Sequence, residues 1–109
     1  MINGDVKQFL DTGWWNGDST IYYNDHIYFF DGFFDEQHNM HITITKWRAQ
    51  NIENKTYKNE HDEKGELMDW ETMEMVAPNE DELREKMLKA KFWDGESFWE
   101  VEKELVWVD

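Results

Sequence analysis

The chain has 109 residues with 25 Asp or Glu, 11 Lys or Arg and no Cys, and its formal net charge is −14. This length is typical of one domain with its own core, and the lack of Cys excludes disulfides and Cys-ligated metal centres. Residues 51–109 hold 8 basic and 18 acidic side chains, which is −10 of the total. Such a field repels nucleic acid and anionic membranes, so we expect a basic protein partner and no direct binding of nucleic acid or membrane.

The first residues of the chain lack the basic region and apolar run of a signal peptide, and no apolar run reaches the length of a membrane span. These features predict a cytoplasmic protein. The chain is also rich in rings, with 7 Trp, 7 Phe and 4 Tyr. Large rings bury much area per residue, so a few elements can form a stable core.

Residues 3–12 predict a short helix that is capped by Asn3 and presents one apolar face. The adjacent Trp14 and Trp15 follow it. Neighbouring residues on a strand point to opposite sides, so we expect one indole to fill the core and the other to cover the edge of a sheet. The alternative is that one of them is an exposed anchor for a partner.

Aromatic and β-branched residues dominate the segment from Thr20 to Arg48 and predict three antiparallel strands in a row, over 20–23, 26–34 and 40–48. Asn24-Asp25 predicts a tight turn, because both residue types tolerate positive φ.

The second of these strands has an unusual centre. Asp31-Gly32 predicts either a β-bulge or another tight turn. Rings lie on both faces of the strand, so we expect it to be central and covered on both sides.

Residues 49–66 are polar and without a period, which predicts a long loop or an extended hairpin reaching beyond the core. Residues 67–76 predict a fourth strand. Asn79 is a good cap for a helix over 80–91, because acids fill the first turn and lysines fill the last.

The end of the chain allows two interpretations. Ser97 and Glu100 have the spacing of a capping box, which favours a short helix over 97–104. Alternation of apolar and acidic residues favours a strand instead. We prefer the helix, followed by an additional short strand at 106–108.

Together these elements predict an α+β fold in a single domain, 1–109. Its core would be an antiparallel sheet of about four strands, the meander 20–48 plus the strand 67–76, with two or three helices packed mainly on one face.

The sequence contains no phosphate-binding glycine loop, nucleophile elbow or zinc motif, so we predict no cofactor and no catalytic residue. His38 and His41 lie near Asp35 and Glu36, and four such side chains could bind a metal. Polar turns often hold similar groups, and we predict no metal site.

Three rows of carboxylates could imitate the charges of duplex DNA, which occur about every 1.7 Å along the axis. One row lies within 62–74, one at Glu80, Asp81, Glu82 and Glu85, and one at Glu96, Glu100, Glu102 and Glu104. In size and composition the chain resembles small phage-encoded anti-restriction and anti-CRISPR inhibitors and nuclease-toxin immunity proteins.

That resemblance implies a non-enzymatic inhibitor that occupies a basic, nucleic-acid-binding site on a protein partner. The predicted partner-binding residues follow the long polar segment and are Glu63, Glu66, Asp69, Glu71, Glu74 and the aromatic Trp70. The alternative is a small ligand-binding or enzymatic α+β domain with an aromatic-lined pocket.

Surplus like charge also makes a prediction about stability. Salt at 0.1 M screens exposed charges over about 10 Å. We expect the melting temperature to rise from low to moderate salt, and to rise again as the pH falls from neutral toward about 5, where carboxylates begin to protonate. Thermal unfolding followed by circular dichroism measures both, and a flat or falling melting temperature in both scans would show that the acids are paired.

Overall fold

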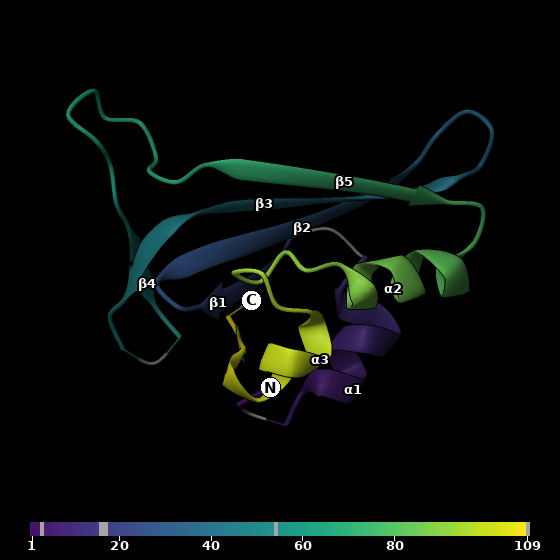
Figure 1. The fold of residues 1–109 in the computed structure, drawn as a ribbon, viewed down its shortest axis with the longest axis horizontal. Helices are drawn as coiled ribbons and strands as arrows, with labels where there is room; N and C mark the ends of the chain where they lie inside the picture. The colour runs from purple at the N-terminus through teal and green to yellow at the C-terminus, as the bar shows by residue number, and fades with distance from the viewer. Residues whose placement is uncertain (3, 16–17, 54, 109) are drawn as a thin grey trace.

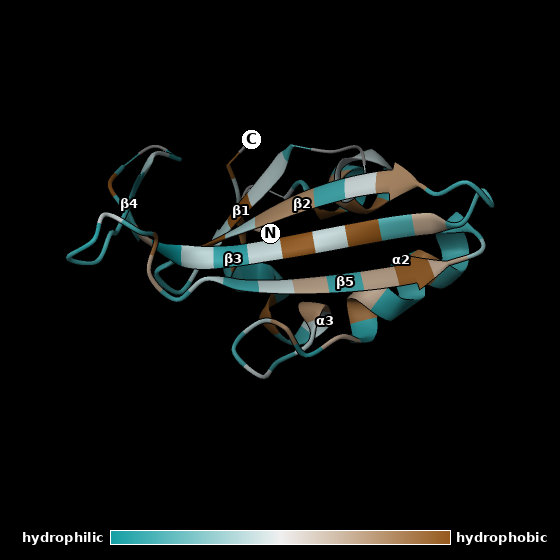
Figure 2. Ribbon diagram, turned by 90° about the horizontal axis from the view of Figure 1, so that it is seen from above, coloured by the Kyte–Doolittle hydropathy of each residue, from teal (hydrophilic) through white to brown (hydrophobic). Residues whose placement is uncertain are grey.

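A computed structural model describes residues 1–2, 4–15, 18–53 and 55–108 (Figure 1). The predicted cap at Asn3 lies outside these residues. Helices cover one face of a curled antiparallel sheet, and Figure 2 looks down on the other face. The elements in chain order are α1 (Val6–Gln8), η1 (Phe9–Gly13), β1 (Ser19–Tyr23), β2 (His26–Phe34), β3 (Met40–Asn51), β4 (Tyr57–Asn59), β5 (Glu71–Ala77), α2 (Glu80–Lys89), α3 (Phe98–Val101), η2 (Glu102–Glu104) and β6 (Val106–Trp107).

The meander of β1, β2 and β3 is confirmed. Its strands pair antiparallel in sequence order, from Ser19 opposite Phe30 to Phe34 opposite Met40. Asn24 and Asp25 form the tight turn with φ of 48° and 60°, the positive values that suit a two-residue hairpin loop. The α+β class follows from this sheet and the helices packed on it.

The sheet has more strands than the predicted four: in the described residues its order is β4-β3-β2-β1-β6, and β5 pairs with β3 beside this path. β3 continues to Asn51 and pairs with β4, so the polar stretch 49–66 is the extended hairpin. β5 begins only at Glu71, four residues later than predicted. β6 pairs with β1 and confirms the additional last strand.

β2 is a regular strand through its centre, so the predicted bulge or turn at Asp31-Gly32 is wrong. Asp31 pairs with Thr43 and Gly32 with Ile42 without a break. Glycine is needed here for a close approach. A Cβ on Gly32 would lie 2.2 Å from the backbone oxygen of Trp15 and 2.6 Å from its indole carbon Cδ1.

The prediction that β2 is covered on both faces is also wrong. Tyr28 and Phe30 are buried beneath the helices, whereas Asp31 and Phe33 are exposed on the opposite face. Ile27 is buried on that second face, so the cover there extends over only one end of the strand.

Trp14 and Trp15 divide as the alternation predicts. Trp14 is fully buried in the core. Trp15 lies over Gly32, contacts Phe34 with 4.9 Å between ring centroids, and donates from Nε1 to the His41 backbone oxygen at 2.9 Å. The second indole therefore covers the face of β2 rather than the sheet edge.

Aromatic rings form the core between the sheet and the helices. Phe9 meets Phe30 edge-on at 5.4 Å between centroids and stacks on Phe98 at 6.0 Å. Trp93 lies 4.3 Å from the ring of Tyr28. Burying a Phe side chain contributes about 1.5–3 kcal/mol, so these rings dominate the stability of a small domain.

The capping predictions are confirmed at both later helices. The Asn79 side chain accepts from the Glu82 amide at 2.9 Å and starts α2. The Glu100 carboxylate accepts from the Ser97 amide at 3.0 Å and starts α3, after which η2 completes the helix predicted over 97–104. In the described residues no helix is long and apolar enough to cross a membrane.

The close approach at Gly32 predicts the effect of a small substitution. Gly32→Ala should destabilise the protein by about 1–3 kcal/mol, because the new methyl group has no room against Trp15. Urea unfolding measures the loss. Asp31→Ala, at an exposed neighbour on the same strand, is the control, and an equal effect of both substitutions would contradict the packing argument.

Candidate interaction surface

The segment after β3 projects beyond the helices and forms an arm, defined here as residues 55–68 (left side of Figure 1). It contains β4 and a tight turn at its tip. Asp62 closes this turn, since its Oδ1 accepts from the Lys64 amide at 2.8 Å and the Glu66 amide at 3.0 Å. Glu63 and Glu66 are exposed on this ordered turn.

Trp70 lies at the base of the arm and is the most accessible indole of the described residues, with 60% of the residue exposed. Its ring stacks on Trp47 of β3 with 5.8 Å between centroids and 15° between planes. The Trp47 Nε1 donates to Asn59 Oδ1 at 2.7 Å, and this hydrogen bond fixes the orientation of the Trp47 ring. Trp70, Glu66 and Leu67 line a hollow of about 410 Å³.

Sequence reasoning missed Trp47, although the alternation in β3 points to it. Ile42 and Ile44 face the core, so the odd-numbered residues of the strand face outward and Trp47 is among them. Its partner Trp70 could not be found this way, because the pairing depends on the register of two strands distant in sequence.

The Asp69 carboxylate contacts His26 of β2. It lies 3.1 Å from Nε2 of His26, and the other ring nitrogen of His26 lies 2.8 Å from the Asn24 backbone oxygen. Asp69 itself adopts a positive φ of 59°. This residue joins the base of the arm to the first hairpin of the sheet.

Glu71 and Glu74 lie on opposite faces of the sheet. Glu71 pairs across the sheet with Lys46 on the helix-covered side, whereas Glu74 pairs with Thr43 on the open side. The predicted site therefore divides. The structure brings Glu66 and Trp70 together at the base of the arm, leaves Glu63 at its tip, and places Glu74 away from them.

Glu74 belongs to a second cluster, centred on His41. Nε2 of His41 lies 2.8 Å from Asp35 Oδ2, and Nδ1 lies 3.0 Å from Glu74 Oε1. The ring also stacks on Phe33 at 4.6 Å. The hydrogen bond to Asp35, and then the one to Glu74, raises the pKa of His41 above its ordinary value and so favours the protonated ring, which joins β3 to its neighbours.

These contacts give a structural role to His41 and Asp35, two of the residues considered above as metal ligands. Both ring nitrogens of His41 face carboxylates, so a protonated ring has no lone pair for a metal. Asp35 also accepts from the Gln37 and Asn39 amides and shapes the turn, and its pKa is lowered mainly by the bond to His41. Among the described residues no three acidic or His side chains are placed to share a metal ion.

The row of acids on α2 is largely compensated within the helix. Arg84 binds Glu80 at 2.7 Å and Asp81 at 3.3 Å, and Lys89 binds Glu85 at 2.9 Å. These are i,i+3 and i,i+4 pairs, each of which contributes only a few tenths of a kcal/mol when exposed.

The last row has local structural duties. Glu100 accepts from the Ser97 amide, which lowers the pKa of Glu100. The hydrogen bond between the carboxyl groups of Glu96 and Glu100 raises the pKa of Glu96. Glu102 binds the amino group of Met1. Among the described residues, Glu63 and Glu66 of the arm take part in no ion pair, whereas Glu60 of the arm binds Arg48 at 2.8 Å.

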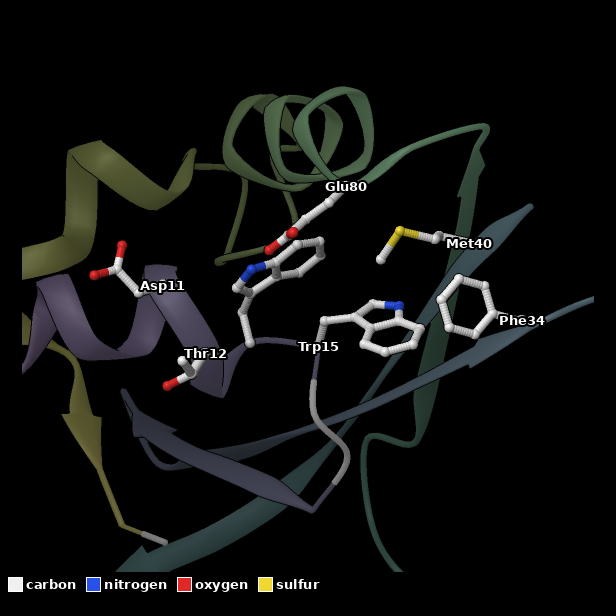
Figure 3. A pocket seen from close by; sticks show the side chains of 7 residues that line it. Asp11, Thr12, Trp15, Phe34, Met40 and Glu80 are labelled. Atoms are coloured by element: carbon white, nitrogen blue, oxygen red, sulfur yellow. The ribbon is translucent and has the colours of Figure 1, made fainter. Parts of the chain in front are cut away.

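A separate hollow of about 380 Å³ lies between η1, the first turn of α2 and the ends of β2 and β3 (Figure 3). Trp15, Phe34 and Met40 form its apolar side. Its two carboxylates are already bound by cations, since Asp11 pairs with Lys7 at 2.7 Å and Glu80 with Arg84. The hollow is thus aromatic, as the alternative function requires, but its acids are engaged elsewhere.

Comparison with protein-family models, with curated proteins and with solved structures finds no match for this chain.

The raised pKa of His41 predicts how stability depends on pH. A group whose pKa is higher in the folded state stabilises fully below its unfolded value of 6.5 and loses this contribution as the pH rises through the folded value. His41→Gln should therefore cost more stability at about pH 6 than at about pH 9. Urea unfolding of both proteins at the two pH values measures the difference.

The exposed His38 in the same turn offers a matched control. His38 has a positive φ of 63°, which Asn tolerates, so His38→Asn leaves the backbone unstrained. This control should show no comparable pH-dependent loss. An equal cost of His41→Gln at both pH values would mean that the ring is not charged in the native state.

Proposed function

We propose that this protein is a non-enzymatic acidic inhibitor that acts in the cytoplasm. It binds the basic, nucleic-acid-binding site of a protein partner, most simply a nucleic-acid-processing enzyme, and excludes nucleic acid in the manner of a DNA mimic. Anti-restriction and anti-CRISPR inhibitors and immunity proteins of nuclease toxins act in this class. The observation that carries the proposal is Trp70, an exposed indole that stacks on Trp47 beside the carboxylate of Glu66.

An exposed ring is a strong anchor when it is already ordered. Trp70 can bury its free face on a partner without losing much side-chain freedom, because stacking on Trp47 holds it before binding. Trp is among the residue types that most often dominate binding energy at interfaces. The hollow beside Leu67 gives a partner side chain a place next to this ring.

The surrounding charge supplies steering. Glu63 and Glu66 are exposed on the arm, and Glu66 lines the hollow beside Trp70. Carboxylates at the rim of an interface raise the association rate with a basic surface and make it sensitive to salt. An anchor within an acidic rim is what a basic groove for nucleic acid would accommodate.

The partner can be sought by affinity capture from a host lysate, with washes across a salt gradient. A captured protein supports the proposal if duplex DNA competes with this chain for it and if its nucleic-acid binding is lost in the complex. A captured protein that binds DNA and this chain at the same time would overturn the proposal, as would turnover of a small molecule by this chain.

Charge reversal on the arm tests the steering. The double change Glu63→Lys and Glu66→Lys should slow association about tenfold or more at low salt and flatten its salt dependence. Glu36→Lys with Glu85→Lys gives the same net charge away from the arm and serves as the control. Stopped-flow or surface plasmon resonance measures the rates, and equal slowing by both pairs would show that only the total charge matters.

Removal of the anchor tests the contact itself. Trp70→Ala should weaken the complex by about 2 kcal/mol or more, mainly through faster dissociation, and leave the salt dependence unchanged. Trp99 is similarly exposed, at 56%, but lies on α3 on the helical side. Trp99→Ala is therefore the matched control, and equal losses for both indoles would contradict the assignment of the site.

A further inference from the structure

β5 has one paired edge and one open edge. It pairs with β3 from Glu71 opposite Lys46 to Ala77 opposite Met40, and among the described residues no strand pairs with its other edge. Figure 2 shows β5 at the border of the sheet, with α2 and α3 below it. An open strand edge is a template for another strand.

The register shows which peptide groups are available. The Arg48 amide donates to Met68 and the Arg48 oxygen accepts from Glu60, so the even-numbered residues of β3 direct their peptide groups toward the edge occupied by β4 and β5. Their partners on β5 are odd-numbered, from Glu71 to Ala77. By alternation, the peptide groups of Thr72, Glu74 and Val76 point away from the sheet.

One end of this edge is already capped. Lys86 of α2 donates from Nζ to the Val76 oxygen at 2.8 Å, which agrees with the outward direction of that carbonyl. The N–H and C=O of Thr72, the N–H and C=O of Glu74 and the N–H of Val76 remain available for an added strand. Pro78 follows the strand and ends the ladder there.

The side chains of β5 favour some kinds of added strand over others. The strand contains no Lys, no Pro and no bulge, which are the usual protections of an open edge, and its charges are Glu71 and Glu74. A second copy pairing antiparallel about Glu74 would set Glu74 of one copy opposite Glu74 of the other, and each copy carries −14. Like charges directly opposite are destabilising, whereas Lys or Arg opposite Glu is favourable.

We propose that the open edge of β5 accepts an extended, basic segment of the protein partner as an additional strand. This inference rests on the proposed function and gives its mode of contact. Backbone hydrogen bonds to Thr72, Glu74 and Val76 provide the register. Basic side chains of the segment lie beside Glu71 on the helix-covered face, and beside Glu74, which His41 also contacts, on the open face. Trp70 precedes the strand directly, so the added strand would run past the anchor.

The edge can be tested before the partner is known. The probe is an octapeptide of alternating Lys and Val, and its acidic twin of alternating Glu and Val is the control. The amides of Thr72, Glu74 and Val76 should exchange with solvent rapidly in the free protein and about tenfold more slowly when the Lys peptide is present. NMR-detected hydrogen exchange measures each amide separately, and the Glu peptide should leave all three rates unchanged.

A substitution at the edge separates backbone pairing from general charge attraction. Thr72→Pro removes an outward N–H without changing the charge or the ladder to β3, and it should weaken binding of the Lys peptide about tenfold. Thr72→Val keeps the N–H and should bind as the unaltered protein does. Peptide binding that survives Thr72→Pro unchanged, or protection that appears only at other amides, overturns the proposal. The exchange measurement on the unaltered protein decides the question even if Thr72→Pro does not fold.

Two further outcomes are informative. Protection of the three amides that rises with protein concentration alone, together with a dimer in analytical ultracentrifugation, would show a second copy on the edge and overturn the basic segment. With an identified partner, binding that is weakened by Trp70→Ala but not by Thr72→Pro would overturn the strand pairing and leave the inhibitor function standing. If neither substitution weakens it, both proposals fail.

Discussion

The structure depends on one aromatic cluster that lies between the sheet and the helices. Phe9, Phe30, Trp93 and Phe98 come from three distant parts of the chain and contact one another there. α1 has 3 residues and α3 has 4, and helices this short are unstable alone in water. The rings of Phe9, directly after α1, and of Phe98 in α3 hold these short helices in place, and the sheet is curled over the same rings.

A single cluster on one face leaves the other face without cover. The described helices lie on one side, so the long strands β2, β3 and β5 present their second side to solvent (Figure 2). Short polar residues, the stacked Trp47 and Trp70, and the ion pairs of His41 occupy that side. The surfaces on which the function is proposed are thus those that the helices cannot reach.

Local signals predicted the local features well. The turn at Asn24-Asp25 and the caps of α2 and α3 depend on a few neighbouring residues, and all three are present. The sequence does not predict the role of Gly32, because this role is a close contact with Trp15, seventeen positions earlier. No local pattern reveals such a contact. The sequence does not distinguish a long loop from the hairpin of β3 and β4, because the polar strands of this hairpin carry almost no periodic signal.

In the candidate site, too, the sequence predicts the residue types but not their arrangement in the tertiary structure. Composition revealed that acids are in surplus, but the positions of Glu71 and Glu74 on opposite faces follow from alternation within a strand whose start the sequence placed too early. Whether an acid is free depends on cations elsewhere in the chain, as with Glu74 and His41 or Glu80 and Arg84.

Counting carboxylates therefore overstates the free negative charge at the surface. Several of the described acids are paired or serve as helix caps, whereas Glu63 and Glu66 of the arm form no ion pair with a described residue. The same surplus of acids opposes pairing between two copies at the open strand edge, because Glu74 of one copy would face Glu74 of the other.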